Sequence, residues 1–321
     1  MRILDSTAVL AALEPDALVD AVAAAMADLS AGRATCPPRI AAQVGTAGVL
    51  AAMPAYVPSL GILAAKLLAI YPDNEAGGHP VHQAMITVFD PATGTPTAMM
   101  DGDVITAWRT AAGSALSVRL LARADATVLA VLGTGPQAAA HARLVARVRD
   151  LSEIRIGGRD PAKVAAVVAE VAADPGLAGV AVHPATLDEA IDGADIVCAT
   201  TSAVEPIVRA GRIADGVHVT SVGYVPHGGE IDPTLYSDAL LAVEHRDTAF
   251  ARYPVGANDL ADAVEAGALD PAAVIELGEL VAGTRAGRTD DRQRTLYKSV
   301  GLAVQDAAAA AVVLAAGSGG S

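Results

Sequence analysis

An apolar run at Val128–Leu132 passes directly into Gly-Thr-Gly-Pro-Gln-Ala at residues 133–138, and an alanine-rich segment follows. This order predicts a buried strand, a tight glycine turn and the first turn of a helix. The first glycine permits the bend, the second leaves room for a pyrophosphate, and the small Ala138 lets the helix pack close to the strand. The N–H groups at the helix end point at the anion. We therefore predict a dinucleotide site with contacts from Gly133, Thr134, Gly135, Gln137 and Ala138.

About 130 residues precede this turn, which is too many for a single nucleotide-binding domain, and 321 residues exceed what one hydrophobic core usually serves. After the turn, strands alternate with helices at the spacing of parallel βαβ units. We predict an α/β fold in which residues 113–298 form a Rossmann domain. Its expected strands are 127–132, 153–157, 180–182, 196–200, 218–222 and 239–243.

The region before the turn has a different pattern. Helical periodicity at residues 5–29 gives way to short apolar runs separated by turn residues, and a long helix is predicted at 103–122. We predict a discontinuous antiparallel-sheet α+β domain at 1–112, joined by a C-terminal helix within 299–321 that begins at Ser299. The last five residues, 317–321, are expected to be a flexible tail. The expected strands are 49–53, 62–70, 83–89 and 96–100.

Composition excludes several classes of partner. A formal charge of −14 disfavours nucleic acid and anionic membrane surfaces. Hydrophobic residues make up 53% of the chain but aromatic residues only 3%, so Ala, Val and Leu must fill the core. Two distant cysteines, Cys36 and Cys198, give no disulfide framework or metal pattern, and no apolar run reaches the ~18 residues of a membrane span. We expect a cytoplasmic protein without a metal.

Three cations stand in settings that need an explanation. Lys66 lies in the run Gly61–Ile70, whose other residues are all apolar. Burying an unpaired ammonium is costly, so this lysine either reaches water or meets an anion. Arg39 and Arg109 each have the simpler explanation of a solvated ion pair, but three cations in one domain would together grip a carboxylate.

Several segments resemble the ornithine cyclodeaminase/mu-crystallin family, in order across nearly the whole chain. They are Met53–Tyr56, Pro80–Ala84, Met99–Gly102 with Ile105-Thr106, Arg109–Ala115, the glycine turn at 133–138, and Lys298–Gly301 before Asp306. The resemblance implies that the first domain carries the substrate pocket and a dimer interface. It also implies that Arg39, Lys66 and Arg109 hold the α-carboxylate of the substrate. The family contains cyclodeaminases, alanine dehydrogenases, ketimine reductases, opine-type amino acid synthases and crystallins that bind small molecules.

One position departs from the cyclodeaminase pattern. Those enzymes carry a proton-handling aspartate after the strand at 218–222, and this chain has Tyr224 there. A phenol with an ordinary pKa near ~10 cannot act as that base at neutral pH, which favours a reductase. Tyr224 and His82 are candidate substrate contacts, with a structural role as the alternative for each. Glu230 and Asp232 are expected to cap the helix that follows them, with a role in the site as the alternative.

The end of the second Rossmann strand bears on the choice of cofactor. NAD enzymes usually place Asp or Glu there to accept the ribose hydroxyls, whereas this chain has Gly158 followed by Arg159, which can pair with a 2′-phosphate. Asp160 has the simpler role of capping the next helix. We expect NADP(H), with NAD(H) as the alternative. Further cofactor contacts are predicted for Thr110, Thr200, Thr201, Val222, Gly223 and Gly301.

Together these features predict an enzyme of amino acid metabolism that uses NADPH to reduce a C=N bond beside a carboxylate. The substrate would be a cyclic ketimine or the imine of a 2-oxo acid and an amine. Lys66 would complete the carboxylate clamp or donate a proton to the nitrogen. Two alternatives stay open: an ornithine-type cyclodeaminase with bound NAD, and a non-catalytic crystallin-like protein that binds NADPH and a ligand. A homodimer is expected because exposed apolar strands would be hazardous in a monomer.

Overall fold

A computed structural model describes residues Met1–Gly317. These residues form two compact units, one of Met1–Arg109 with the residues from Gly301 onward, and one of Thr110–Val300. The first boundary falls inside helix α3 (Gly102–Leu121), so one continuous helix contributes to both units. Apart from Gly317, the expected tail lies outside the described residues.

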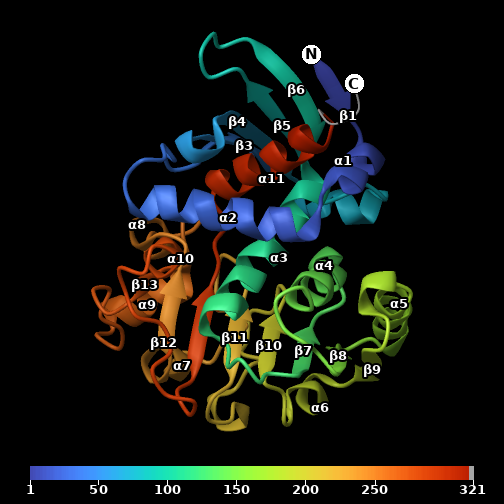
Figure 1. Cartoon of the computed structure of the whole chain (residues 1–321), viewed down its shortest axis with the longest axis vertical. Coiled ribbons are helices and arrows are strands. Elements are labelled where there is room, and N and C mark those ends of the chain that lie inside the picture. The colour runs from blue at the N-terminus through green and yellow to red at the C-terminus, as the bar shows by residue number, and fades with distance from the viewer. Residues whose placement is uncertain (318–321) are drawn as a thin grey trace. The chain divides into compact units, whose positions relative to one another are not determined.

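The first unit is built on a six-stranded sheet with the order β1-β6-β5-β4-β3-β2 (Figure 1). The strands from β2 to β6 pair antiparallel, as predicted for this domain, although β2 was not among the predicted strands. The first strand instead joins β6 in parallel, so the sheet is mixed at this edge. The strands are β1 (Arg2–Leu4), β2 (Ile40–Val44), β3 (Gly48–Val57), β4 (Ile62–Ile70), β5 (His82–Phe89) and β6 (Pro96–Asp101).

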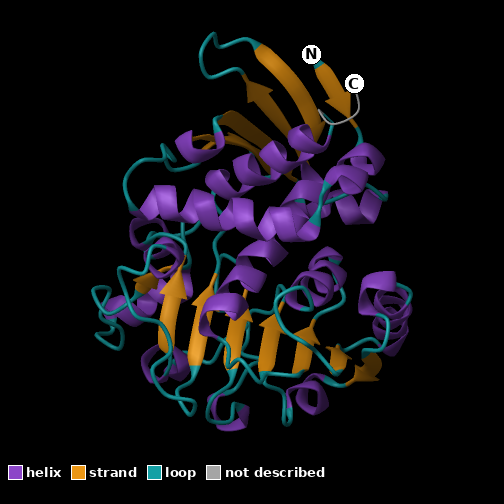
Figure 2. Cartoon of the chain, viewed as in Figure 1, coloured by secondary structure: helices purple, strands orange, loops and turns teal. Residues whose placement is uncertain are grey.

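Helices cover one face of this sheet (Figure 2). They are α1 (Ser6–Ala12), α2 (Pro15–Ser30) and α11 (Ala303–Ala316), with 3₁₀ turns η1 (Pro58–Leu60) and η2 (Pro72–Gly77). Helix α11 packs on β3 and β4, and α2 packs beside α11. The single helix expected at residues 5–29 is in fact two, because Leu13 has an extended backbone and Pro15, which has no N–H to donate, begins α2.

The second unit is a Rossmann-type domain with a parallel sheet in the order β13-β12-β14-β11-β10-β7-β8-β9. Strand β14 is missing from the predicted set. The predicted helix start at Ser299 is wrong, because α11 begins at Ala303. Gly301, with φ of +74°, separates this strand from α11. The strands are β7 (Val128–Leu132), β8 (Glu153–Gly157), β9 (Ala181–Ala185), β10 (Ile196–Ala199), β11 (His218–Ser221), β12 (Leu240–Val243), β13 (Ile275–Glu276) and β14 (Thr295–Lys298).

Helices pack against these strands and enclose a core of small aliphatic side chains, in which Cys198 is fully buried. Helix α4 packs on β7, α5 packs on β8 and β9, and α6 packs on β7 and β8. No helix of the described residues is long and apolar enough to cross a membrane. The helices are α4 (Pro136–Val145), α5 (Pro161–Ala172), α6 (Leu187–Ile191), α7 (Thr234–Asp238), α8 (Arg246–Ala249), α9 (Asn258–Glu265) and α10 (Leu277–Val281), with 3₁₀ turns η3 (Pro175–Leu177) and η4 (Ala210–Arg212).

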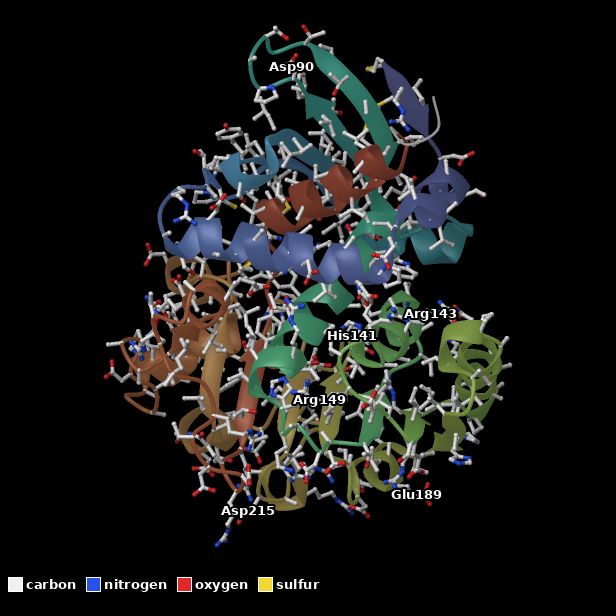
Figure 3. All side chains as sticks on the ribbon, viewed as in Figure 1. Asp90, His141, Arg143, Arg149, Glu189 and Asp215 are labelled. Atoms are coloured by element: carbon white, nitrogen blue, oxygen red, sulfur yellow. The ribbon has the colours of Figure 1, made fainter. Side chains whose placement is uncertain are left out.

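Arg149, labelled in Figure 3, fixes the C-terminal end of α3. Its guanidinium donates hydrogen bonds to the backbone oxygens of Val118 and Ala122, both at 2.8 Å, and of Arg123 at 2.9 Å. The last carbonyls of a helix lack intrahelical partners, and a cation stabilises the negative end of the helix dipole. The helix that carries Arg109 is therefore anchored at its far end.

Strand register aligns the carboxyl ends of the central parallel strands. Leu132 pairs with Ala199, Ala199 with Ser221, and Ser221 with Lys298. The chain leaves β7 for β8 on one side and later returns to β10 on the other, which makes the β7/β10 junction a topological switch point. Open α/β sheets bind ligands beyond the carboxyl ends of the strands at such a point.

Candidate active site

Lys66 lies on the face of β4 that α11 covers. Alternate residues of this strand, Ile62, Ala64 and Leu68, are buried on the same face, so strand geometry places the lysine in the core. Its side chain is 3% exposed, and Nζ lies 3.0 Å from Oδ1 and 2.9 Å from Oδ2 of Asp306. The sequence predicted that this lysine either reaches water or meets an anion. In the structure it meets an anion, the carboxylate of Asp306.

Arg109 reaches the same carboxylate from α3. Its Nε donates to Asp306 Oδ1 at 2.9 Å, and its Nη1 donates to Oε1 of Gln305 at 3.1 Å. A Cβ on Gly301 would lie 2.7 Å from Arg109 Nη1, and the φ of +74° also disfavours a side chain there. Arg39 completes the group by donating from Nη2 to the Gly301 oxygen at 3.1 Å. The three predicted cations therefore converge, together with Gly301.

We call Lys66, Arg109, Arg39 and Asp306 the cation cluster. Burial lowers the pKa of Lys66 to about 8, and the neighbouring arginines add to this effect while Asp306 opposes it. Burial by itself would raise the pKa of Asp306, but Lys66 and Arg109 outweigh it and hold that pKa below its usual value. The cation cluster thus holds three cations and one ionised carboxylate, and the excess positive charge favours a further anion.

Two polar residues of this region, Gln305 and Asp306, were not predicted as site residues. Both lie near the start of α11, ahead of four fully buried alanines at 307–310. A polar side chain in such an apolar helix raises the same question as Lys66 in its strand, and that signal could have identified both.

His82 stands apart from the cation cluster. Its Nδ1 lies 2.7 Å from Oδ1 of Asp103, and both side chains are partly exposed. His82 precedes Ile86, the cross-strand neighbour of Lys66, by four residues, or about 13 Å along the strand. A substrate contact from His82 stays a prediction.

In the second unit, the glycine turn has the predicted geometry. Gly133 has φ of +122°, and a Cβ there would lie 2.7 Å from Oγ1 of Thr200, so both conformation and space require glycine. Gly135 precedes the first residue of α4, and a Cβ on it would meet no atom within 4 Å. The first glycine permits the bend, and the second leaves open space at the switch point.

The surroundings of this turn fit a dinucleotide. No side chain caps α4. Pro136 has no N–H and the N–H of Ala138 donates to the Gly135 oxygen, so in the first turn the N–H of Gln137 is the group left available to an anion. Ala138 is fully buried against the strands. Within residues 1–317, the buried Oε1 of Gln137 has no hydrogen-bond partner. The turn therefore has open space beside Gly135 and a buried oxygen without a hydrogen-bond partner among the described residues. A bound dinucleotide would fill the space and supply a hydrogen bond to the oxygen.

Glu230 organises the loops that follow β10 and β11. It is 1% exposed, and its Oε2 accepts hydrogen bonds from the N–H and the hydroxyl of Thr201 at 2.8 and 2.7 Å. Its Oε1 accepts from Gly223 N at 2.6 Å and from Ser221 Oγ at 2.8 Å. The capping role expected for Glu230 is therefore wrong, although Asp232 does accept a hydrogen bond from the N–H of the first residue of α7.

Five further predicted cofactor contacts lie at three places in this unit, and a sixth, Gly301, belongs to the first unit. Thr200 and Thr201 follow β10 and Val222 and Gly223 follow β11, where Lys298 also donates to the Gly223 oxygen at 2.9 Å. Thr110 is buried in α3. The contacts of these residues with a cofactor stay predictions.

The hydroxyl of Tyr224 forms a hydrogen bond within the protein. The hydroxyl donates to the backbone oxygen of Pro254, and the ring centroid lies 5.1 Å from that of Tyr253. These contacts link the loop after β11 to the loop that contains Tyr253 and Pro254, which agrees with the structural alternative. A substrate contact from Tyr224 stays a prediction.

The end of β8 presents Arg159 beside a glycine. A Cβ on Gly158 would lie 2.7 Å from Cγ2 of Val164 and 3.0 Å from Cγ2 of Thr134, so packing disfavours an acidic side chain there. Asp160 caps α5 by accepting from Ala162 N at 2.9 Å, as predicted. Arg159 is exposed and makes no hydrogen bond or ion pair with the described residues.

A pocket of about 350 Å³ lies between α9 and the loops after β10 and β11. Its charged lining residues are Asp259 and Asp262, which are already paired with Lys298 and Arg252. Acidic lining disfavours a carboxylate, so the cation cluster is the better candidate for an anionic substrate group.

Comparison with known proteins agrees with this geometry. Residues 2–320 match the family model described as the ornithine cyclodeaminase/mu-crystallin family. The chain is 33% identical over 267 residues to ketimine reductase mu-crystallin of Mus musculus, a match that spans 83% of this chain and 80% of the relative.

Two solved structures share the fold over 99% of this chain. Delta(1)-pyrroline-2-carboxylate reductase of Thermococcus litoralis, in complex with NADH and L-proline, is 30% identical with a TM-score of 0.91 and 98% of its chain covered. An archaeal alanine dehydrogenase dimer with bound NAD is 27% identical with a TM-score of 0.90 and 96% covered. The chain therefore belongs to the ornithine cyclodeaminase/mu-crystallin family.

Proposed function

We propose that this protein is an oxidoreductase that reduces a C=N bond next to a carboxylate with a nicotinamide dinucleotide. The observation that carries the proposal is the cation cluster, which combines an excess of buried positive charge with a lysine whose pKa lies near neutrality. Membership in a family that includes ketimine and Delta(1)-pyrroline-2-carboxylate reductases supports the same chemistry.

In this proposal the substrate carboxylate binds the cation cluster. Nη2 of Arg109 has no acceptor in the described part of the chain, and a guanidinium fork suits a planar carboxylate. Arg39 adds a second guanidinium beside Gly301. The substrate class is thus a cyclic ketimine acid or the imine of a 2-oxo acid.

Lys66 is the proposed proton donor to the imine nitrogen. A bound reduced nicotinamide would supply a hydride to the imine carbon, and one proton added to the nitrogen completes the reduction to an amine. A pKa of about 8 keeps the ammonium mostly protonated at neutral pH while making proton transfer easier than from an ordinary lysine. Asp306 holds Nζ in place at 2.9–3.0 Å.

One residue, Tyr224, favours a reductase activity over a cyclodeaminase activity for this protein. Tyr224 takes the place of the aspartate that handles protons in cyclodeaminases, and its hydroxyl is already donated to Pro254 O. A phenol in that bond is a poor base at neutral pH.

NADPH is the proposed cofactor form. The exposed guanidinium of Arg159 is free to pair with a 2′-phosphate, and the crowding at Gly158 disfavours an acid that would prefer the free ribose hydroxyls of NADH. The proposed cofactor contacts are those that follow β7, β8, β10 and β11.

A homodimer through the six-stranded sheet is also proposed. Cross-strand register puts a set of exposed apolar side chains on the face opposite Lys66. These are Ile3, Ile40, Val44, Leu50, Leu67 and Met85, each 39–72% exposed. An apolar sheet face of this kind is typical of an interface with another chain, and one relative with this fold is described as a dimer.

Lys66→Met tests the proposed function. Methionine matches the length of lysine but cannot donate a proton, so reduction of Delta(1)-pyrroline-2-carboxylate should fall by about 10²–10⁴-fold. Asp306 keeps its ion pair with Arg109, so the variant should fold and bind NADPH as the unmodified protein does. Thermal unfolding and NADPH titration check this. Turnover within a few-fold of the unmodified protein would remove Lys66 from the chemistry.

A further inference from the structure

Gln305 presents an unpaired hydrogen-bond donor inside the cation cluster. The residue is fully buried at the start of α11. Its Oε1 accepts hydrogen bonds from Arg109 Nη1 at 3.1 Å and from Leu302 N at 2.9 Å. Its Nε2 is buried and has no acceptor within residues 1–317.

The direction of this amide is fixed by its partners. Arg109 Nη1 and the backbone N–H of Leu302 are both donors without acceptor capacity, so the side-chain oxygen must face them. The Nε2 of Gln305 therefore points elsewhere, and reversing the amide would set donor against donor twice. Because Nε2 and Oε1 share one carbon, the unpaired N–H groups lie beside the guanidinium of Arg109.

An unpaired buried donor is costly, and most buried polar groups in proteins have partners. An apolar residue at this position of an alanine-rich helix would avoid the cost. The charges around Gln305 indicate what could satisfy it, since Lys66, Arg109 and Arg39 outnumber Asp306. An anionic acceptor is attracted to this place and can take the free N–H.

We propose that Nε2 of Gln305 donates a hydrogen bond to a carboxylate oxygen of the substrate, next to Arg109. The inference rests on the proposed function, which supplies the carboxylate-bearing substrate. Gln305 then acts as a neutral contact that distinguishes a carboxylate, which only accepts hydrogen bonds, from a carboxamide, which also donates them.

Gln305→Glu tests the contact directly. The substitution keeps an oxygen for Arg109 Nη1 and Leu302 N but replaces the free donor with an acceptor. The control is Gln293→Glu, because Oε1 of Gln293 also accepts a backbone N–H, from Thr289 at 3.1 Å, but lies in the other unit. Calorimetry with NADPH present measures the binding of L-proline and of L-prolinamide, its uncharged carboxamide.

The unmodified protein and Gln293→Glu should prefer L-proline. Gln305→Glu should weaken L-proline binding by at least about tenfold and strengthen L-prolinamide binding, because the carboxamide can donate to the new carboxylate. If the new carboxylate acted only by long-range charge repulsion, it would weaken the binding of L-proline but would not strengthen the binding of L-prolinamide. NADPH affinity should stay the same in all three proteins.

Three results would overturn the contact. One is an unchanged preference for L-proline in Gln305→Glu. Another is equal weakening of L-proline and L-prolinamide binding, which would show that the substitution disrupts the whole cluster rather than one hydrogen bond. The third is an unmodified protein that binds neither probe, because the cluster would then not be an α-carboxylate site. If the preference reverses but no imine is reduced, the contact stands and the proposed reductase falls.

Discussion

Arg159 is the residue on which the choice between NADPH and NADH rests. Removing its guanidinium should delete a charge-assisted bond to the 2′-phosphate, which is worth about 1.5–3 kcal/mol. Arg159→Ala should therefore weaken NADPH binding by about ten- to a hundredfold and leave NADH binding almost unchanged. Fluorescence titration with each cofactor measures both values. Equal affinity of the unmodified protein for the two cofactors would contradict the assignment.

Single residues also show where prediction from the sequence ends. Lys66 could be predicted to meet water or an anion because its strand is otherwise apolar. Its partner could not be identified, since Asp306 lies 240 positions further along the chain and only the packing of α11 on β4 joins them. Asp160 was predictable as a cap because a cap depends only on the next few residues. Glu230 was not, because its partners lie in two separate loops.

At the scale of elements, the sequence predicted some strands to the residue and missed others altogether. Strands β4 and β8 have the predicted bounds, 62–70 and 153–157. Strand β14 contains threonine, tyrosine and lysine in four residues, and it is a strand because β11 and β12 flank it on both sides. Strands β1 and β13 have three and two residues and depend in the same way on their neighbours. Such segments become strands because they pair with neighbouring strands in the folded protein, and the local sequence pattern does not contain this information.

Two buried histidines tie α3 to its neighbours in the second unit. His141 of α4, labelled in Figure 3, lies 3.0 Å from Oγ of Ser114, and His218 of β11 lies 3.0 Å from Oγ of Ser117. Burial lowers the pKa of His141 to about 4. Burial, with smaller effects from nearby arginines, lowers the pKa of His218 to about 3. Both side chains are therefore neutral in the folded protein at neutral pH.

These depressed pKa values predict a loss of stability in acid. Below about pH 6.5 the unfolded chain binds protons that the folded protein excludes, so the free energy of unfolding should fall by up to ~1.4 kcal/mol per pH unit for each histidine. The loss should continue to about pH 4 for His141 and about pH 3 for His218. Urea unfolding at several pH values measures this slope.

His218→Gln should make that slope shallower by one proton, since glutamine does not titrate. His227→Gln, the same substitution at an exposed histidine, is the matched control. Parallel curves for the unmodified protein and His218→Gln would show that His218 does not contribute to the acid sensitivity.

At the scale of the whole molecule, the exposed apolar face of the first sheet predicts association. Leu67 and Met85 are cross-strand neighbours on that face and are 39% and 45% exposed. A charge between two packed apolar faces is strongly unfavourable, so Leu67→Asp should convert a dimer into a monomer. Light scattering measures the mass, and Leu10→Asp, on exposed α1, is the matched control. An unmodified protein with the mass of one chain would contradict the dimer.

The transfer of a deuteride tests the account most directly. The protein is incubated with Delta(1)-pyrroline-2-carboxylate and NADPH that carries deuterium at the transferable position, and the product is analysed by mass spectrometry. The account predicts proline with one deuterium at the α-carbon, formed in step with NADPH oxidation. Lys66→Met should form this product about 10²–10⁴-fold more slowly. Two results would contradict it. One is binding of NADPH without reduction of any carboxylate-bearing imine. The other is release of ammonia from ornithine without net oxidation of the cofactor.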